Sequence, residues 1–197
     1  MKFFKKAVLL LAVTGILSAY ACSKNDGNEP VKEPQKSEVP SALVGDWMES
    51  WSLYMQYNFD PLLYNPDTKV WFRGSHDAWS MDPRPGFGVR IGDAGDFIWA
   101  IVEGTGSGGC QIYTADYVKG TVSVEGNKIT FYPQVRRQKY NSVCSPGNNF
   151  DRDEDKSSFS LTYALSTSNN NSGQVFDVLT FTSPDGSQIA FSKLKTQ

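Results

Sequence analysis

Apolar and polar residues alternate with a period of two over most of the chain from Leu43 onward. The clearest case is the run Ser-Phe-Ser-Leu-Thr-Tyr-Ala-Leu at residues 158–165. This alternation is typical of a strand with one buried and one exposed face. A capped amphipathic helix is not indicated anywhere, and only residues 48–57 are ambiguous. The pattern therefore predicts a β-rich body.

Two hairpins can be assigned a register from the sequence. Gly126-Asn127 suits a two-residue turn, and Pro184-Asp185-Gly186 suits a type I turn closed by a glycine bulge. The first register pairs Glu125 with Lys128, Val124 with Ile129 and Val122 with Phe131, and the second pairs Ser183 with Ser187, Phe181 with Ile189 and Leu179 with Phe191. In both hairpins the apolar pairs share one face, so a slip of one residue would destroy the match.

Further strands are expected at 44–53, 69–73, 87–91, 97–102 and 111–118. About eight or nine strands joined without helical crossovers predict an all-β antiparallel barrel or sandwich. Closure into a barrel removes exposed sheet edges, which favours an up-and-down barrel of about eight strands.

The first 21 residues have the features of a secretory signal peptide: a basic start followed by an apolar run over 7–17. The segment Leu17-Ser-Ala-Tyr-Ala-Cys22 resembles the bacterial lipobox, in which the cysteine is lipidated and becomes the first mature residue. Plain cleavage after Ala21 is the alternative. The resemblance implies that Cys22 anchors the protein to a lipid bilayer.

Residues 22–41 are rich in proline and in alternating Lys and Glu, and they have too few apolar side chains to fold. We expect a disordered tether that spans roughly 25 Å, followed by a folded domain over 42–197. Ser23 stands where an aspartate would favour inner-membrane retention in Gram-negative lipoproteins. An outer-membrane location is therefore expected, and exposure at the cell surface stays open.

The motif Gly45-Asp-Trp47, at the start of the first strand, resembles the Gly-x-Trp opening of lipocalins. The block Tyr117-Val-Lys-Gly-Thr-Val, with Gly126-Asn127, Pro133 and the cysteines around it, is similar to bacterial lipocalin-like lipoproteins. The resemblance covers about 43–194. It implies a lipocalin-like barrel whose closed end is plugged by Trp47, with a basic residue nearby that would be Lys193 or Lys195.

Cys110 and Cys144 are the two cysteines that remain after Cys22. In an oxidising envelope such a pair usually forms a disulfide, which would stabilise the fold by about 3.5–4 kcal/mol. Two free thiols are the alternative. A metal site is disfavoured, because the chain has a single histidine, His76, with no cysteine beside it.

Little in the sequence points to catalysis. His76 is expected in a loop and is the only candidate base for a serine triad, and no Gly-x-Ser-x-Gly motif is present. The acidic run 151–155 lacks the glycine and the final glutamate of a calcium loop and is expected to be a solvated turn. A non-enzyme without a cofactor is predicted. With 19 Lys and Arg against 21 Asp and Glu, no nucleic-acid partner is expected.

Aromatic residues make up 13% of the chain, more than one barrel end needs. Trp51, Trp71 and Trp99 are candidates to line a cavity for a small apolar ligand, although they could equally be core. Three functions follow: a membrane-anchored ligand-binding barrel, a filled barrel that serves as a structural or interaction lipoprotein with an envelope protein partner, and a hydrolase. The hydrolase is least favoured, because no spacing identifies a pair of catalytic carboxylates.

Overall fold

The computed structural model describes residues 38–49, 62–73, 76–77, 86–107, 109–170 and 173–194. All of them belong to one compact unit, Pro34–Gln197. The only helical element among them is the short 3-10 helix η1 (Pro146–Asn148). The strands are β1 (Gly45–Glu49), β2 (Leu63–Asn65), β3 (Val70–Arg73), β4 (His76–Asp77), β5 (Gly86–Ile91), β6 (Asp96–Ser107), β7 (Cys110–Glu125), β8 (Lys128–Ser142), β9 (Phe150–Asp153), β10 (Phe159–Asn169), β11 (Val175–Thr182) and β12 (Gln188–Leu194).

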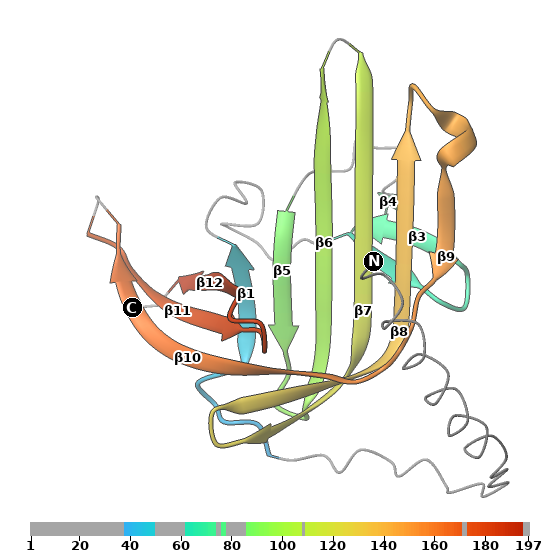
Figure 1. Cartoon of the computed structure of the whole chain (residues 1–197). Helices are drawn as coiled ribbons and strands as arrows, with labels where there is room; N and C mark the ends of the chain where they lie inside the picture. Colours follow the sequence, from blue (N-terminus) through green and yellow to red (C-terminus); the bar gives the residue numbers. More distant parts are fainter. Residues whose placement is uncertain are drawn as a thin grey trace, which may run out of the picture. The chain divides into compact units, whose positions relative to one another are not determined.

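Eight of these strands form a ring in which each is hydrogen-bonded to the next: β1, β5, β6, β7, β8, β10, β11 and β12. The last strand, β12, pairs with β1, and every pairing is antiparallel. The order around the ring follows the order along the chain (Figure 1). The predicted all-β, up-and-down antiparallel barrel is therefore confirmed.

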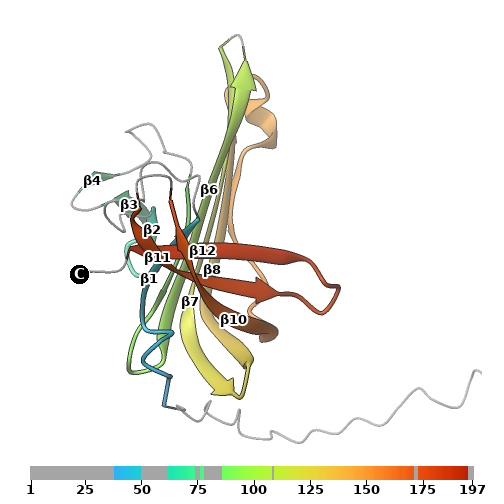
Figure 2. The same ribbon diagram turned by 90° about the vertical axis from the view of Figure 1, so that its left-hand side faces the viewer.

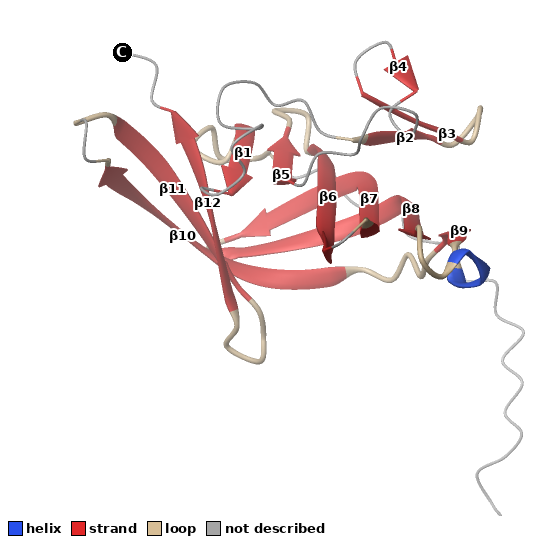
Figure 3. Cartoon of the chain, turned by 90° about the horizontal axis from the view of Figure 1, so that it is seen from above, coloured by secondary structure: helices blue, strands red, loops and turns tan. Residues whose placement is uncertain are grey.

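The ring is uneven because two of its seams are short, and the pairing of β1 with β12 covers only Met48 and Glu49. β10 pairs with β8 only over Phe159–Thr162, opposite Lys128–Phe131. Beyond that point β10 leaves β8 and continues with β11 alone among the described strands. As a result β10, β11 and β12 run across the direction of the long strands β6 to β8 (Figures 2 and 3).

Both predicted hairpins are present with the predicted register. In the first, Val122 lies opposite Phe131 and Val124 opposite Ile129. In the second, Phe181 lies opposite Ile189 and Leu179 opposite Phe191, and the backbone N–H of Gly186 donates to the carbonyl of Ser183 at 2.9 Å. The small strands β2 and β4 and the edge strand β9 were not predicted, because their two to four residues carry too little periodicity.

The inner face of the ring is filled mainly by aromatic rings. Trp47, Phe97, Phe131, Phe181 and Phe191 are all at most 1% exposed. Phe97 and Phe131 meet edge to face with their centroids 5.0 Å apart, as do Phe181 and Phe191 at 5.8 Å. Edge-to-face packing places the positive rim of one ring on the negative face of another. These contacts form the main core.

A second cluster lies on the outer face of the barrel. The small sheet β2-β3-β4 places Tyr64 and Trp71 against Val102 of β6 and against Ala115 and Tyr117 of β7. The Tyr64 and Trp71 ring centroids are 5.3 Å apart. This outer cluster buries one side of the long strands, which would otherwise expose an apolar face.

Polar contacts hold the small sheet to β8 and β9. The indole Nε1 of Trp71 donates to Asp151 Oδ2 at 3.1 Å, and Arg137 Nε donates to Asp151 Oδ1 at 2.6 Å. Arg137 also reaches Asp153 at 3.2 Å and lies 5.2 Å from the Tyr64 ring centroid. The acidic run predicted as a solvated turn is therefore an edge strand, and its acids pair with an arginine that sequence spacing could not identify. His76 similarly lies in β4 and not in a loop.

The burial of Tyr117 predicts how stability responds to alkaline pH. Burial raises the pKa of Tyr117 from 10.0 to about 12. The folded state therefore keeps a phenol proton that the unfolded chain releases, so the free energy of unfolding falls as pH rises from about 10 to about 12. The loss should be about 2–3 kcal/mol. Tyr117→Phe should remove this part of the decline in denaturant unfolding measured across that range.

The matched control is Tyr140→Phe, which alters a partly buried tyrosine stacked on Phe150. This control should retain the decline, because Tyr117 is still present. An equal decline in the Tyr117→Phe variant and the unmodified protein would contradict the prediction.

Candidate functional site

One end of the barrel is closed around Trp47. Its indole Nε1 donates to the Leu43 carbonyl at 2.8 Å, and the ammonium of Lys193 lies 4.4 Å from its ring centroid. Lys193 also donates to the Val44 carbonyl at 3.0 Å. Gly45 has a φ of 134°, which favours glycine, and a Cβ atom there would lie 3.1 Å from Lys193 Cδ. The tryptophan of the Gly45–Trp47 motif is therefore buried against the last strand of the ring through Lys193.

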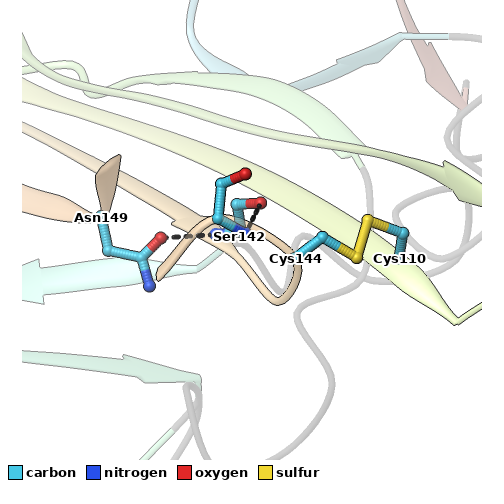
Figure 4. The surroundings of a disulfide bond; sticks show 5 residues. Cys110, Ser142, Cys144 and Asn149 are labelled. Carbon is cyan, nitrogen blue, oxygen red and sulfur yellow. Dashed lines mark hydrogen bonds between the residues drawn. A yellow bond between two sulfur atoms is a disulfide. The ribbon is translucent and has the colours of Figure 1, made fainter. Parts of the chain in front are cut away.

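The predicted disulfide is present between Cys110 and Cys144, whose Cα atoms are 5.4 Å apart. Cys110 begins β7, and Cys144 follows the end of β8. Beside the bridge, the N–H of Val143 donates to the Gln111 carbonyl at 3.0 Å, and the N–H of Ser142 donates to Asn149 Oδ1 at 2.7 Å (Figure 4). The bridge ties together the ends of β7 and β8 that are farthest from their shared turn.

Trp99 is the centre of the aromatic packing. Among the described residues its ring lies 5.4–6.1 Å from the centroids of five others: Phe87, Phe131, Phe159, Phe181 and Phe191. Phe131, Phe181 and Phe191 are fully buried, whereas Phe87, Trp99 and Phe159 are only partly buried. We call these three partly buried rings the aromatic layer. They lie where the filled interior ends.

Next to the aromatic layer, the inner face becomes polar. Ile101, two residues after Trp99 on β6, lies opposite Asp116, which lies opposite Gln138. Gln138 Nε2 donates to Asp116 Oδ2 at 3.1 Å. Glu49 of β1 lies opposite the buried Phe191, so it also faces inward. We call Glu49, Asp116, Arg136 and Gln138 the polar row.

A bulge between β7 and β8 turns Arg136 inward. Gly120 pairs with Pro133 and Lys119 with Val135, so Gln134 has no residue opposite it. Such an extra residue reverses which side chains face each side of the sheet. Arg136 therefore lies opposite Val118 of the main core, while Arg137 lies opposite Tyr117 of the outer cluster.

Three atoms of the polar row are buried without a hydrogen-bond partner: Glu49 Oε2, Asp116 Oδ1 and Arg136 Nε. Arg136 is held through another atom, since its Nη1 donates to the Asp155 carbonyl at 3.2 Å. Buried polar atoms in native proteins nearly always have partners, so each exception calls for an explanation. The described residues contain no group of His, Cys, Asp and Glu side chains that could hold a metal ion.

The other predicted site residues lie elsewhere. Trp71 is in the outer cluster and does not share the inner face with Trp99. Cys22 and Trp51 lie outside the described residues. The polar row was missed by sequence reasoning, because strict alternation from Ile129 and Phe131 places Arg136 outside. The one available signal was the pairing of a glycine with a proline, Gly120 with Pro133, within two otherwise regular strands.

Within the described residues there is no helix of the length and apolarity needed to cross a membrane. Comparisons with protein-family models, with curated proteins and with solved structures give no match for this chain. The functional interpretation therefore rests on the geometry of the aromatic layer and the polar row.

The bulge predicts that the stability of the fold is sensitive to substitution of Gly120. A Cβ atom there would collide with the backbone carbonyl oxygen of Tyr132, which cannot move without breaking the β7–β8 pairing. We expect Gly120→Ala to lower the free energy of unfolding by at least about 2 kcal/mol in denaturant titrations. Gly147→Ala is the control, because a Cβ atom at Gly147 meets nothing within 4 Å and should change stability by less than about 0.5 kcal/mol. Equal effects of the two substitutions would count against the bulge as a constraint.

Proposed function

We propose that this protein is a non-catalytic lipoprotein of the outer membrane in the cell envelope, and that its barrel binds a small molecule beside the aromatic layer. The observation that carries the proposal is the partial exposure of Phe87, Trp99 and Phe159 on the inner face of the barrel. Binding sites for small molecules are commonly lined by aromatic side chains with a few convergent polar groups. The aromatic layer and the polar row supply both.

The closed end supports a lipocalin-like barrel. A tryptophan buried at the start of the first ring strand, covered by a basic side chain from the last ring strand, agrees with what the Gly45–Trp47 resemblance implies. Lys193 is the basic residue concerned. In an eight-stranded barrel the interior is either filled by side chains or large enough for one small ligand. Here the part near Trp47 is filled, so a ligand would lie beyond Trp99.

A filled barrel that acts as a structural or interaction lipoprotein is the second candidate. It is favoured by the full burial of Phe97, Phe131, Phe181 and Phe191, which leaves the apolar interior near Trp47 occupied by the protein's own rings. In that case the contacts of this protein would be with an envelope protein, and the aromatic layer would be the edge of the core.

The anchor is tested by removing the lipidated thiol. We expect Cys22→Ala to release the protein from the envelope fraction of cells, because one residue would carry all of the acyl chains. Sedimentation of membranes followed by immunoblotting measures the release. Ser23→Ala, which keeps the cysteine, should remain with the membranes. Continued sedimentation of the Cys22→Ala protein would refute the anchor.

Ligand binding is tested with the tryptophans as reporters. Titration of the detergent-solubilised protein with maltose, with decanoate and with decylamine should change tryptophan emission saturably for at least one of the three ligands, because Trp99 borders the proposed site. Trp99→Phe keeps an aromatic ring in the layer but should lose most of this response. Trp71→Phe removes a tryptophan of the outer cluster and should keep the response. If the unmodified protein responds saturably to none of these ligands, the filled barrel is the better function.

A further inference from the structure

We propose that the ligand of this barrel carries hydroxyl groups and that a neutral sugar is its chemical class, with the polar row binding its hydroxyls and the aromatic layer its carbon–hydrogen face. This inference rests on the proposed function and specifies the chemistry of the same site. It begins from the three buried atoms of the polar row that have no hydrogen-bond partner: Glu49 Oε2, Asp116 Oδ1 and Arg136 Nε.

All three atoms belong to residues whose side chains face the same side of the sheet as the aromatic layer. Glu49 lies opposite Phe191, whose ring is 5.1 Å from Phe87 and 6.0 Å from Trp99. Asp116 lies opposite Ile101, two residues along β6 from Trp99. Arg136 lies opposite Val118, which is itself opposite Trp99. A molecule resting on Trp99 would therefore have two carboxylates and one guanidinium at its edges.

The three atoms without hydrogen-bond partners restrict which chemical groups the ligand can carry. Two are carboxylate oxygens, which only accept, and one is a guanidinium N–H, which only donates. A hydrocarbon chain would satisfy none of them. An ammonium group would suit Glu49 and Asp116 but would face the positive charge of Arg136. An anion would suit Arg136 but would face two negative charges.

A hydroxyl group can donate to a carboxylate and accept from a guanidinium N–H, so one uncharged group serves all three positions. A sugar ring carries several hydroxyls on its rim and presents carbon–hydrogen bonds on its face. An aromatic ring such as Trp99 packs well against that face, since apolar contact requires no hydrogen bond. The combination of rings and unfilled charged groups therefore points to a sugar and not to a purely apolar molecule.

The remaining hydrogen bonds hold the row in place for such a ligand. Gln138 Nε2 donates to Asp116 Oδ2 at 3.1 Å, which orients the carboxylate and leaves Oδ1 for the ligand. Arg136 Nη1 donates to the Asp155 carbonyl at 3.2 Å, which anchors the guanidinium and leaves Nε for the ligand. In each case one atom is fixed by the protein, and its buried neighbour has no hydrogen-bond partner within the protein.

The test is isothermal titration calorimetry of the full chain in a zwitterionic detergent that contains no sugar. The probes are maltose, lactose, cellobiose and N-acetylglucosamine, with decanoate as the anionic and decylamine as the cationic hydrocarbon-chain probe. We expect saturable binding of at least one of the four sugars. Asp116→Asn and Arg136→Met should each weaken that binding at least tenfold. Asp67→Asn, an exposed acid in the β2–β3 turn, should leave it unchanged.

Thermal unfolding of Glu49→Met separates a binding role from a structural one. If Glu49 Oε2 binds the ligand and does not stabilise the fold, Glu49→Met should keep or raise the unfolding temperature. The same substitution should weaken sugar binding at least tenfold. A lower unfolding temperature with unchanged sugar binding would overturn the role of Glu49.

The outcomes distinguish the two proposals. Binding of decanoate or decylamine without binding of any of the four sugars would overturn the sugar inference and leave a ligand-binding barrel. Sugar binding that the Asp116 and Arg136 substitutions do not weaken would also overturn it. If none of the six probes binds, both the inference and the ligand-binding function fall, and the filled barrel remains.

Discussion

The pairing of β7 with β8 determines what each face of this barrel carries. Antiparallel strands place successive side chains on opposite faces, and a single inserted residue reverses that order from that point on. Here the inserted residue is Gln134, and Gly120 permits the close approach of the Tyr132 carbonyl that the bulge requires. On the N-terminal side of the bulge the inner face of β8 is apolar. On the C-terminal side of the bulge the inner face carries Arg136 and Gln138.

The same reversal explains the outer cluster. It places Val135 and Arg137 outward, where Val135 packs against the outer cluster and Arg137 contacts the Tyr64 ring. Arg137 in turn binds Asp151 of β9, which accepts a hydrogen bond from Trp71. A small sheet and an edge strand are thus joined to the wall of the barrel through one arginine. Without the bulge that guanidinium would point into the barrel.

The inner face combines closely packed aromatic rings with the polar row. The rings around Trp99 hold one another in place, because close-packed aromatic rings leave little room for alternative rotamers. The polar row begins where this packing ends, so its side chains extend from strands that the rings already hold in position. A preorganised wall of this kind is what a binding site requires. The disulfide and the outer cluster support the same long strands at their far end and on their outer face.

The sequence by itself determined the fold class, both hairpin registers and the disulfide pair. These follow from local rules: a period of two, turn residues at fixed positions, and two cysteines that remain after Cys22, a pair that would form a disulfide in an oxidising compartment. The eight-stranded ring could also be expected, since a run of short antiparallel strands needs closure to remove its edges. Trp99 was identified as a candidate from its residue type alone, with core and cavity both open.

Only the tertiary structure decided which face of the barrel wall carries the residues of β8 that follow Gln134. The bulge at Gln134 adds one residue to β8 and has no periodic signature of its own, so alternation predicted the wrong face for Arg136. Trp71 could not be separated from Trp99 by sequence, because the outer cluster forms only when the small sheet folds onto the barrel. Glu49, Asp116 and Arg136 come from three strands, and it is the pairing of the strands in the ring that places all three on the inner face with Trp99.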